Sequence, residues 1–194
     1  MRLFVALDID DAIRERLARF LEGVRGFAPD LNWARPENMH ITLKFIGEQR
    51  PEKLDAITQS LHALHHTSQI EVSFRGYGFF PTAKSPRVFW AGIESGPQLA
   101  DLAKSVDVTL SPLGIPEENR AFSPHLTLAR SGSGRPQRGP GDRPNNRFQR
   151  VQEKLSAMPA LDFGTMAAHE FFLYESKLSP KGARYTKLES FPFS

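Results

Sequence analysis

One four-residue pattern occurs twice in this chain and restricts what the surrounding segments can form. Residues 40–43 read His-Ile-Thr-Leu, and residues 125–128 read His-Leu-Thr-Leu. In a β-strand, side chains at positions i and i+2 point to the same face. Each copy therefore predicts a half-buried strand that presents one imidazole and one hydroxyl on one face and buries two branched apolar side chains on the other. Two such strands facing each other would form a cleft equipped to move protons onto and off a phosphoester.

A third match to His-x-Thr serves as a control for chance. Residues 65–67 read His-His-Thr, but they lie at the end of a predicted helix, lack the interleaved apolar residues and are followed by Ser. The two full copies each follow a loop that contains Asn and Pro, and each has a basic residue shortly after it. We interpret the third match as accidental, and the candidate site residues are therefore His40, Thr42, His125 and Thr127.

Composition narrows the class of protein. The chain of 194 residues has no cysteine, which excludes disulfides and thiolate metal ligands and favours a reducing compartment. The apolar run at residues 3–7 is too short for a signal peptide and is followed by an acid. No stretch approaches the roughly 20 apolar residues that a membrane span needs. We therefore expect a cytoplasmic protein without a membrane partner.

Positive charge is concentrated in one segment. Residues 130–150 contain six arginines and one acid, whereas the whole chain carries a net charge of only +3. A local basic segment favours a polyanionic partner, although a solvated loop of this composition would also keep the protein soluble. Gly, Pro and Ser are frequent within it, which predicts a mobile basic loop at about residues 131–147.

Hydrophobic periodicity divides the rest of the chain into helices and strands. Helices are predicted where apolar residues recur at helical spacing, at residues 11–26, 51–65, 97–113 and 144–157. Strands are predicted at residues 2–8, 39–46, 69–79, 87–93, 124–130, 165–175 and 183–190. Loops are predicted at residues 33–38 and 116–123, just before the two motif strands.

Each half of the chain thus runs from a helix through a loop into a His-x-Thr strand. This rhythm predicts an α+β fold with two lobes, each an antiparallel sheet with helices on one face, and a cleft between them. We expect residues 1–194 to form a single bilobal domain, with the strands at 69–79 and 87–93 passing between the lobes. Trp33 and Trp90 are expected to be core residues.

Other chemistries fit the motifs less well. A zinc site could use His40 and His125 with His169 or Glu170, but neither His40 nor His125 has a second histidine at H-x-H or H-x-x-x-H spacing. A nucleophilic serine is not supported, because no Ser lies in a G-x-S-x-G turn. The two motif histidines could also be unrelated core residues.

The sequence segments around the motifs resemble those of the two-histidine (2H) phosphoesterase superfamily. The similarity is greatest to the bacterial and archaeal RNA 2′,3′-cyclic phosphodiesterases, historically named 2′-5′ RNA ligases (LigT-like), and it covers nearly the whole chain. The matching segments lie at residues 2–7, 38–47, 87–90, 122–130, 173–176 and 184–188. The basic stretch at 131–147 is longer than the family pattern, which bears on substrate size rather than on the core chemistry.

The resemblance implies a bilobal α+β fold with pseudo-twofold symmetry and no metal or other cofactor. It implies that the protein hydrolyses RNA 2′,3′-cyclic phosphate ends to 2′-phosphates, with 2′-5′ ligation as the reverse reaction. His40 would be the proton donor and His125 the proton acceptor, while Thr42 and Thr127 hold the phosphate oxygens. The expected partner is RNA with a cyclic phosphate end, tRNA fragments among the candidates, and we expect a monomer.

Three further residues are candidates for binding the substrate. Arg130 leaves the second motif strand and could reach the phosphate or the next nucleotide, while Phe45 and Tyr185 could stack on a base. Related functions stay open at this point. The cleft could instead open a sugar 1″,2″-cyclic phosphate or cleave 2′-5′-linked oligoadenylate, or the protein could be a non-catalytic RNA-binding module.

Overall fold

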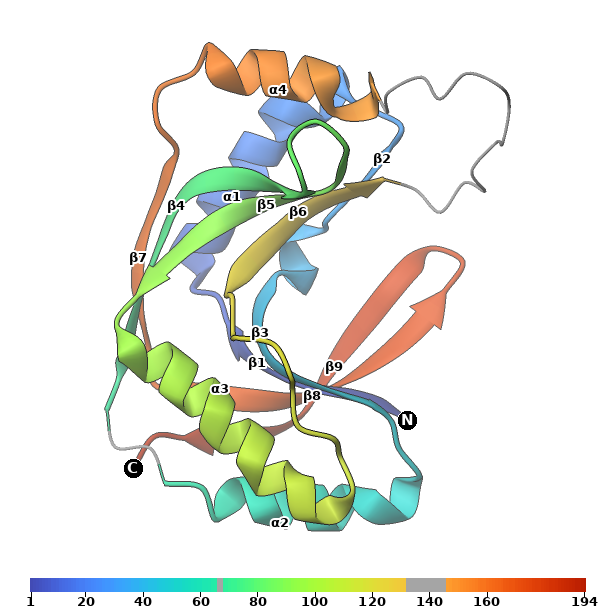
Figure 1. The fold of residues 1–194 in the computed structure, drawn as a ribbon, viewed down its shortest axis with the longest axis vertical. Coiled ribbons are helices and arrows are strands. Elements are labelled where there is room, and N and C mark those ends of the chain that lie inside the picture. Colours follow the sequence, from blue (N-terminus) through green and yellow to red (C-terminus); the bar gives the residue numbers. More distant parts are fainter. Residues whose placement is uncertain (66–67, 132–145) are drawn as a thin grey trace.

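Two antiparallel sheets form the framework of the protein (Figure 1). The computed structural model describes residues 1–65, 68–131 and 146–194. A four-stranded sheet has the order β3-β1-β8-β9, and a five-stranded sheet has the order β2-β6-β5-β4-β7. The strands are β1 (Arg2–Asp8), β2 (Leu31–Trp33), β3 (His40–Glu48), β4 (Ile70–Pro81), β5 (Pro86–Ser95), β6 (His125–Ser131), β7 (Asp162–Ala168), β8 (Glu170–Ser179) and β9 (Gly182–Pro192).

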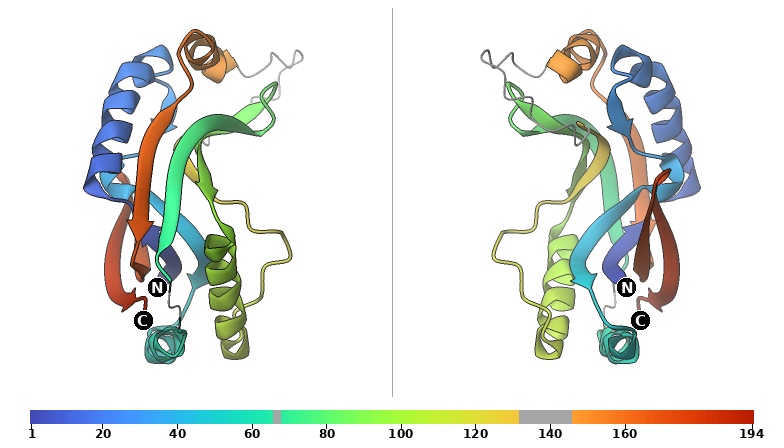
Figure 2. Two further views of the ribbon diagram at one scale, coloured as in Figure 1. Left: turned by 90° about the vertical axis from the view of Figure 1, so that its left-hand side faces the viewer. Right: turned by 90° about the vertical axis from the view of Figure 1, so that its right-hand side faces the viewer.

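Helices cover the outer faces of the sheets (Figure 2). The helix α1 (Asp11–Val24) packs against β7, and α4 (Gln149–Ser156) contacts the 3₁₀ turn that follows α1. The helices α2 (Leu54–His62) and α3 (Pro97–Leu110) contact each other, and they pack against β9 and β3 respectively. The four-stranded lobe therefore comprises its sheet with α2 and α3, and the five-stranded lobe comprises its sheet with α1 and α4. This arrangement confirms the predicted α+β fold with two antiparallel sheets.

The two lobes are built by equivalent chain paths. In one path β1 leads into α1 and returns as β3, and in the other β5 leads into α3 and returns as β6. Both helices have 14 residues, and each crosses to the other sheet. The helix α1 follows β1 of the four-stranded sheet and packs on β7 of the five-stranded sheet, while α3 follows β5 of the five-stranded sheet and packs on β3 of the four-stranded sheet. In each path the returning strand pairs antiparallel with the first strand and begins with the motif histidine. The pseudo-twofold relation therefore extends to the motif strands themselves.

A single buried core connects the lobes. Leu7 and Ile41 from the four-stranded sheet belong to the same apolar cluster as Phe89 and Leu128 from the five-stranded sheet. A second, small cluster of Phe4, Ala6, Phe172 and Tyr174 covers the opposite face of the four-stranded sheet. His40 lies on that second face. Residues 4, 6 and 8 of β1 point to the same face because side chains alternate along a strand, and Asp8 is the residue that pairs with His40.

Four predicted elements are corrected by the structure. The strands at 69–79 and 87–93 do not pass between the lobes, because β4 and β5 pair with each other inside the five-stranded sheet. The predicted strand at 165–175 is two strands, since the chain changes sheets at His169, between β7 and β8. The pattern of apolar residues predicts that a segment is extended, but it does not show which sheet the segment joins. Part of the predicted loop at 33–38 belongs to β2, which is too short to show a period.

Other boundaries move by a few residues. The helix predicted at 51–65 is a 3₁₀ turn followed by α2, which ends at His62, and the helix predicted at 144–157 is a 3₁₀ turn followed by α4. Most of the expected basic loop, residues 132–145, lies outside the described residues, as do residues 66–67 of the chance motif. Among the described helices, none has the length and apolar character needed to cross a bilayer.

Candidate active site

Each motif lies at the start of a strand, and the two strands contact each other where the sheets meet (Figure 1). The predicted alternation is present in both, with residues 41 and 43 and residues 126 and 128 buried, while Thr42 and Thr127 are half-buried. The chain itself brings the motifs together. Trp33 of β2 pairs with Ala129 of β6, and the backbone N–H of the next residue donates to the carbonyl of Leu128 at 2.8 Å. One short 3₁₀ turn later the chain begins β3.

A β-bulge follows the threonine in each motif strand. The pairing of β1 with β3 shifts between Thr42 and Lys44, and the pairing of β5 with β6 shifts between Thr127 and Ala129. A bulge inserts one extra residue, so the next side chains change faces. The residues that would have followed the threonines onto the motif face, Lys44 and Ala129, are therefore buried. Their successors Phe45 and Arg130 are exposed instead, on the motif side of their strands.

Both imidazoles are held in the same way. Nδ1 of His40 lies 2.7 Å from the carbonyl oxygen of Asn38, and Nδ1 of His125 lies 3.0 Å from the carbonyl oxygen of Ser123. A carbonyl can only accept a hydrogen bond, so each Nδ1 carries the proton and donates it. This fixes the ring orientation and leaves Nε2 available for proton transfer at both positions.

His40 lies in an aromatic pocket. Its ring centroid is 4.7 Å from that of Phe4, 5.1 Å from that of Tyr185, which is edge-on, and 6.1 Å from that of Tyr174. Burial lowers the pKa of His40 below its ordinary value, and the nearby charge of Arg14 acts in the same direction. The hydrogen bond to the Asn38 carbonyl and the charge of Asp8 oppose this shift without reversing it.

An ionic network lies beside this pocket. Asp8 pairs with His40 across the β1–β3 ladder, and its Oδ1 accepts from Nη2 of Arg14 at 2.6 Å. Its other oxygen accepts from Nζ of Lys187, which also lies 4.0 Å from the ring centroid of Phe172. Burial alone would raise the pKa of Asp8, but the hydrogen bonds from Lys187 and from a backbone N–H, with the two positive charges, hold it below its ordinary value.

His125 has a more open environment. Its side chain is exposed, and its closest aromatic neighbour is Trp90, with ring centroids 6.5 Å apart. The expectation that Trp90 is a core residue is wrong. Its indole is only half-buried and lies over Gly78, where an added Cβ would approach the ring to 2.1 Å. Trp90 and Thr127 are cross-strand partners, so the indole covers the motif face.

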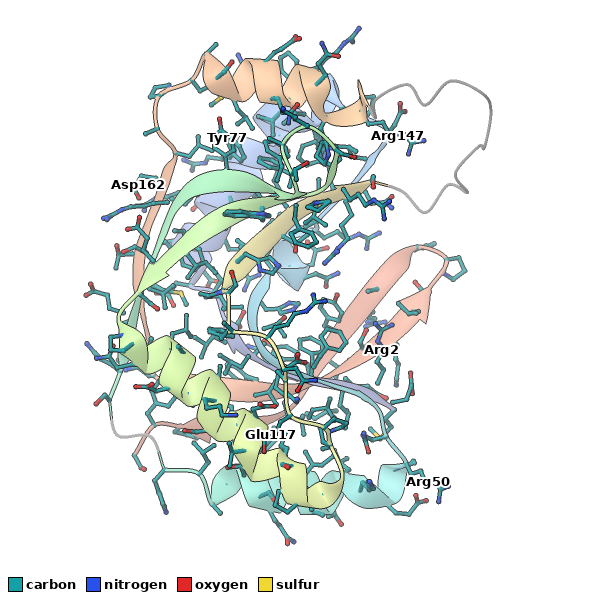
Figure 3. All side chains as sticks on the ribbon, in the orientation of Figure 1. Arg2, Arg50, Tyr77, Glu117, Arg147 and Asp162 are labelled. Carbon is teal, nitrogen blue, oxygen red and sulfur yellow. The ribbon has the colours of Figure 1, made fainter. Side chains whose placement is uncertain are left out.

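The three predicted substrate-binding residues lie at different depths. Tyr185 is part of the wall around His40. Phe45 is 48% exposed, stacks on Phe4 at 5.9 Å between centroids, and carries the guanidinium of Arg2 at 5.5 Å from its ring (Figure 3). Arg130 is exposed on β6, opposite Val88 of β5. Phe45 and Arg130 belong to the motif strands themselves, whereas Tyr185 belongs to β9 at the other edge of the four-stranded sheet.

The described parts of the chain contain no ligand set for a metal ion. Within residues 1–65, 68–131 and 146–194, no group of three or more His, Asp or Glu side chains is placed to hold a metal ion. The suggested third ligands His169 and Glu170 instead line a separate hollow, which shares Asp8 and Lys187 with the pocket of His40.

Sequence reasoning missed the ionic residues around His40. An acid at the end of the first strand was a usable signal for Asp8, since a strand that pairs with a motif strand places its side chains beside the motif. Arg14 and Lys187 carry no such signal, because they reach the site from a helix and from the last strand.

Comparison with known proteins agrees with this arrangement. The family described as LigT like Phosphoesterase matches residues 7–90 and 93–185, and each stretch contains one motif. The chain is similar to an Archaeoglobus fulgidus protein named RNA 2′,3′-cyclic phosphodiesterase, with 37% identity over 98% of this chain and 99% of the relative. A Methanothermobacter thermautotrophicus protein of the same name is 31% identical over 98% of both chains.

Solved structures show the same fold. The Thermus thermophilus protein TT0787 superimposes with a TM-score of 0.77 and 30% identity, covering 100% of this chain and 98% of that one. Escherichia coli LigT complexed with 3′-AMP superimposes with a TM-score of 0.76 and 26% identity, with the same coverage. From its sequence, its fold and its two motif strands, this chain belongs to the family of LigT-like phosphoesterases.

Proposed function

We propose that this protein hydrolyses the 2′,3′-cyclic phosphate at the end of an RNA strand, leaving a 2′-phosphate. The observation that carries the proposal is the matched pair of histidines, each with Nδ1 bound to the carbonyl two residues before it and each at the start of one of two contacting strands. Relatives named RNA 2′,3′-cyclic phosphodiesterase, alike over nearly their whole length, supply the substrate class.

The reaction needs a base on one side of phosphorus and an acid on the other. Nε2 of His125 accepts a proton from water, and the resulting hydroxide attacks phosphorus. The bond to the 3′ oxygen breaks, and Nε2 of His40 donates its proton to that leaving oxygen. An imidazole with a pKa of about 6.5 performs either task near neutral pH, and each contributes about 10²–10⁴-fold.

The different environments of the histidines support these roles. The protonated form of a group with a lowered pKa is a stronger acid, which suits His40 for donation to a leaving alkoxide. The negative charge of the bound diester favours that protonated form. The exposure of His125 gives it access to the attacking water.

The threonines and the aromatic residues complete the binding site. The hydroxyls of Thr42 and Thr127 donate to the non-bridging phosphate oxygens, where negative charge increases in the transition state. Phe45, with the guanidinium of Arg2 over its ring, offers a platform for a base. Arg130 binds the phosphate or the next nucleotide, and the basic segment 131–147 binds the rest of the strand, which can be a tRNA fragment.

One assay tests the proposal. An RNA oligomer ending in a 2′,3′-cyclic phosphate is incubated with the protein, and the position of the phosphate in the product is determined. We expect a 2′-phosphate, and we expect His40→Ala and His125→Ala each to reduce turnover by at least about 10²-fold. His169→Ala, which changes a histidine outside the two motifs, serves as the control and keeps its activity.

Near-normal turnover by both motif variants would refute the paired acid–base mechanism. No turnover by the unmodified protein, together with RNA binding, would favour a non-catalytic RNA-binding module. The same preparation, incubated with a sugar 1″,2″-cyclic phosphate and with 2′-5′-linked oligoadenylate, compares the related substrates. Incubation of cyclic-phosphate and 5′-hydroxyl RNA ends at high concentration tests ligation, which is the reverse of the same transfer.

A further inference from the structure

Arg14 makes four contacts that join the first strand to the turn before the first motif. Its Nη2 donates to Oδ1 of Asp8 at 2.6 Å and to the carbonyl of Ile9 at 3.0 Å. Its Nη1 donates to the carbonyl of Pro36 and, at 3.4 Å, to that of Met39. The guanidinium therefore binds acceptors from the end of β1 and from both ends of the 3₁₀ turn.

That turn contains the acceptor for His40. The carbonyl of Asn38 lies between the two carbonyls held by Arg14, and it receives the Nδ1 proton of His40 at 2.7 Å. The side chain of Asn38 donates to the carbonyl of Ala183 at 2.9 Å, so β9 holds the turn from the other side. Movement of this turn would shift the Asn38 carbonyl and release Nδ1.

We infer that Arg14 is a positioning residue for His40: by clamping the 36–39 turn onto the end of β1, it holds the Asn38 carbonyl where it fixes His40 as the Nδ1–H tautomer with Nε2 facing the substrate. This inference rests on the proposed function, because it assigns Arg14 a part in the same proton transfer. Arg14 itself need not touch the substrate.

The charge of Arg14 adds a second, separable effect. Besides Arg14, the wall of the pocket around His40 contains three charged side chains and two tyrosines. The charged residues are Asp8, Glu37 and Lys187, and the tyrosines are Tyr174 and Tyr185. Among these neighbours Arg14 contributes to lowering the pKa of His40, whereas Asp8 raises it. A substitution that keeps the charge and one that removes it should therefore differ in their pH profiles.

The geometry requires an arginine rather than a lysine. A guanidinium presents donors in a planar fork and can reach acceptors on two segments at once. A lysine ammonium keeps the charge but donates from a single atom at the end of a flexible stem. Arg14→Lys thus removes the clamp and keeps the charge, while Arg14→Met removes both and keeps the apolar stem.

The experiment measures kcat and KM on cyclic-phosphate RNA, the pH dependence of kcat/KM, and the ¹⁵N NMR signals of the histidine ring nitrogens. The signal of His40 is assigned by its loss in His40→Ala. We expect both Arg14 variants to lose about 10-fold to 10²-fold in kcat, with little change in KM, and to show a mixture of His40 tautomers. Because His40 must be protonated to act as the acid, its pKa sets the alkaline limb, which should stay in place in Arg14→Lys and move to higher pH in Arg14→Met.

Arg16→Lys is the matched control, since Arg16 lies on the same helix and donates to the carbonyl of Phe163 at 3.1 Å, away from the motif. It should match the unmodified protein in every readout. A single Nδ1–H tautomer with normal kcat in Arg14→Lys would overturn the inference. So would a loss of kcat with unchanged tautomer and unchanged pH profile in both Arg14 variants, because that marks a purely structural role.

The two proposals fail separately. If Arg14→Met does not fold, Arg14→Lys decides alone through its kcat and its tautomer. If His40→Ala keeps full turnover, the proposed function is wrong whatever Arg14 does. If His40→Ala is inactive and both Arg14 variants behave like the unmodified protein, only the positioning role is wrong.

Discussion

The two motif strands have the same backbone geometry and different surroundings. Each begins with a histidine anchored through Nδ1, and each carries a bulge after its threonine. The residue opposite His40 is Asp8, which recruits Arg14 and Lys187, whereas the residue opposite His125 is Gly92. A Cβ at Gly92 would lie 2.2 Å from the carbonyl oxygen of Arg75, so no side chain fits there.

This difference teaches how a symmetric fold can support an asymmetric reaction. In the proposed mechanism one imidazole gives a proton while the other takes one, and different environments favour opposite protonation states in the two groups. The repeated strand geometry provides the common orientation of Nε2. The aromatic wall and the ionic network, which the described residues form around His40 and not around His125, provide the difference.

The largest expected effect tests whether the two histidines act as a unit. We expect the double variant His40→Ala/His125→Ala to be at most about 10-fold slower than the slower of the two single variants. The reason is that the effects of residues that stabilise the same transition state do not add. Turnover of cyclic-phosphate RNA under single-turnover conditions is the measurement. Losses that simply multiply would show that the histidines contribute independently.

The two motif strands also differ just after the motif, where β3 carries a buried charged residue and β6 does not. Lys44 is 2% exposed and its Nζ donates at 2.6 Å both to Asp107 of α3 and to the carbonyl of Pro116, while the equivalent position in β6 is Ala129. Both carboxylate oxygens of Asp107 also accept from the backbone N–H of Glu118. Lys104 bridges Asp107 at 3.7 Å and Glu117 at 2.9 Å, on the segment after α3 (Figure 3).

We expect Lys44→Met to destabilise the protein by about 3–5 kcal/mol, because it leaves a buried carboxylate without its main partner. The double variant Lys44→Met/Asp107→Leu should lose less. Denaturant unfolding checks both. Equal losses of unfolding free energy in the single and double variants would show that the unpaired Asp107 carboxylate is not the cause of the destabilisation.

The same ion pair predicts a pH dependence of stability. Burial alone would raise the pKa of Asp107, but its hydrogen bonds from Lys44 and Glu118 and the charges of Lys44 and Lys104 hold it below its ordinary value of 3.8. A lowered folded-state pKa means that this stabilisation is present above pH 3.8 and is lost as the pH falls through the folded-state pKa. The double variant should therefore lose less stability on acidification than the unmodified protein.

The two threonines occupy equivalent, half-buried positions in the motif strands, so substituting each in turn tests whether the two motifs bind the phosphate equally. Thr42→Val and Thr127→Val keep the strand and remove one hydroxyl each, so we expect each to lose about 10²-fold in kcat, the usual cost of one donor to a developing anion. Thr186→Val on β9, an exposed strand position outside the motifs, should change little. A tenfold difference between the two motif variants would show that the phosphate is held mainly by one lobe.

The smallest expected effect concerns the residue opposite each histidine. The charge of Asp8 raises the pKa of His40, so Asp8→Asn should lower that pKa further and move the alkaline limb of kcat/KM, which the proton donor controls, to lower pH. Asp101→Asn, an exposed change on α3, is the control. A limb that moves to higher pH in Asp8→Asn would mean that the loss of the Arg14 and Lys187 contacts outweighs the lost charge.

Much of the fold and part of the site could be predicted from the sequence. The helix α1 buries Ile13, Leu17, Leu21 and Val24, and this helical spacing is visible along the chain. The alternation in the motif strands was equally local, since it depends only on neighbouring positions. The change of sheet at His169 could not be seen, because a strand shows which face it buries but not which strand it pairs with.

By itself, the sequence determined that two His-x-Thr strands exist, which of their side chains are buried, and which family the chain belongs to. Only the tertiary structure decided that bulges turn Phe45 and Arg130 to the motif face, and that Arg14 and Lys187 gather at Asp8 beside His40. The physical reason is range. Strand alternation is set by steps of two residues, whereas the charge around an imidazole is set by groups that the folded chain brings from its first helix and its last strand.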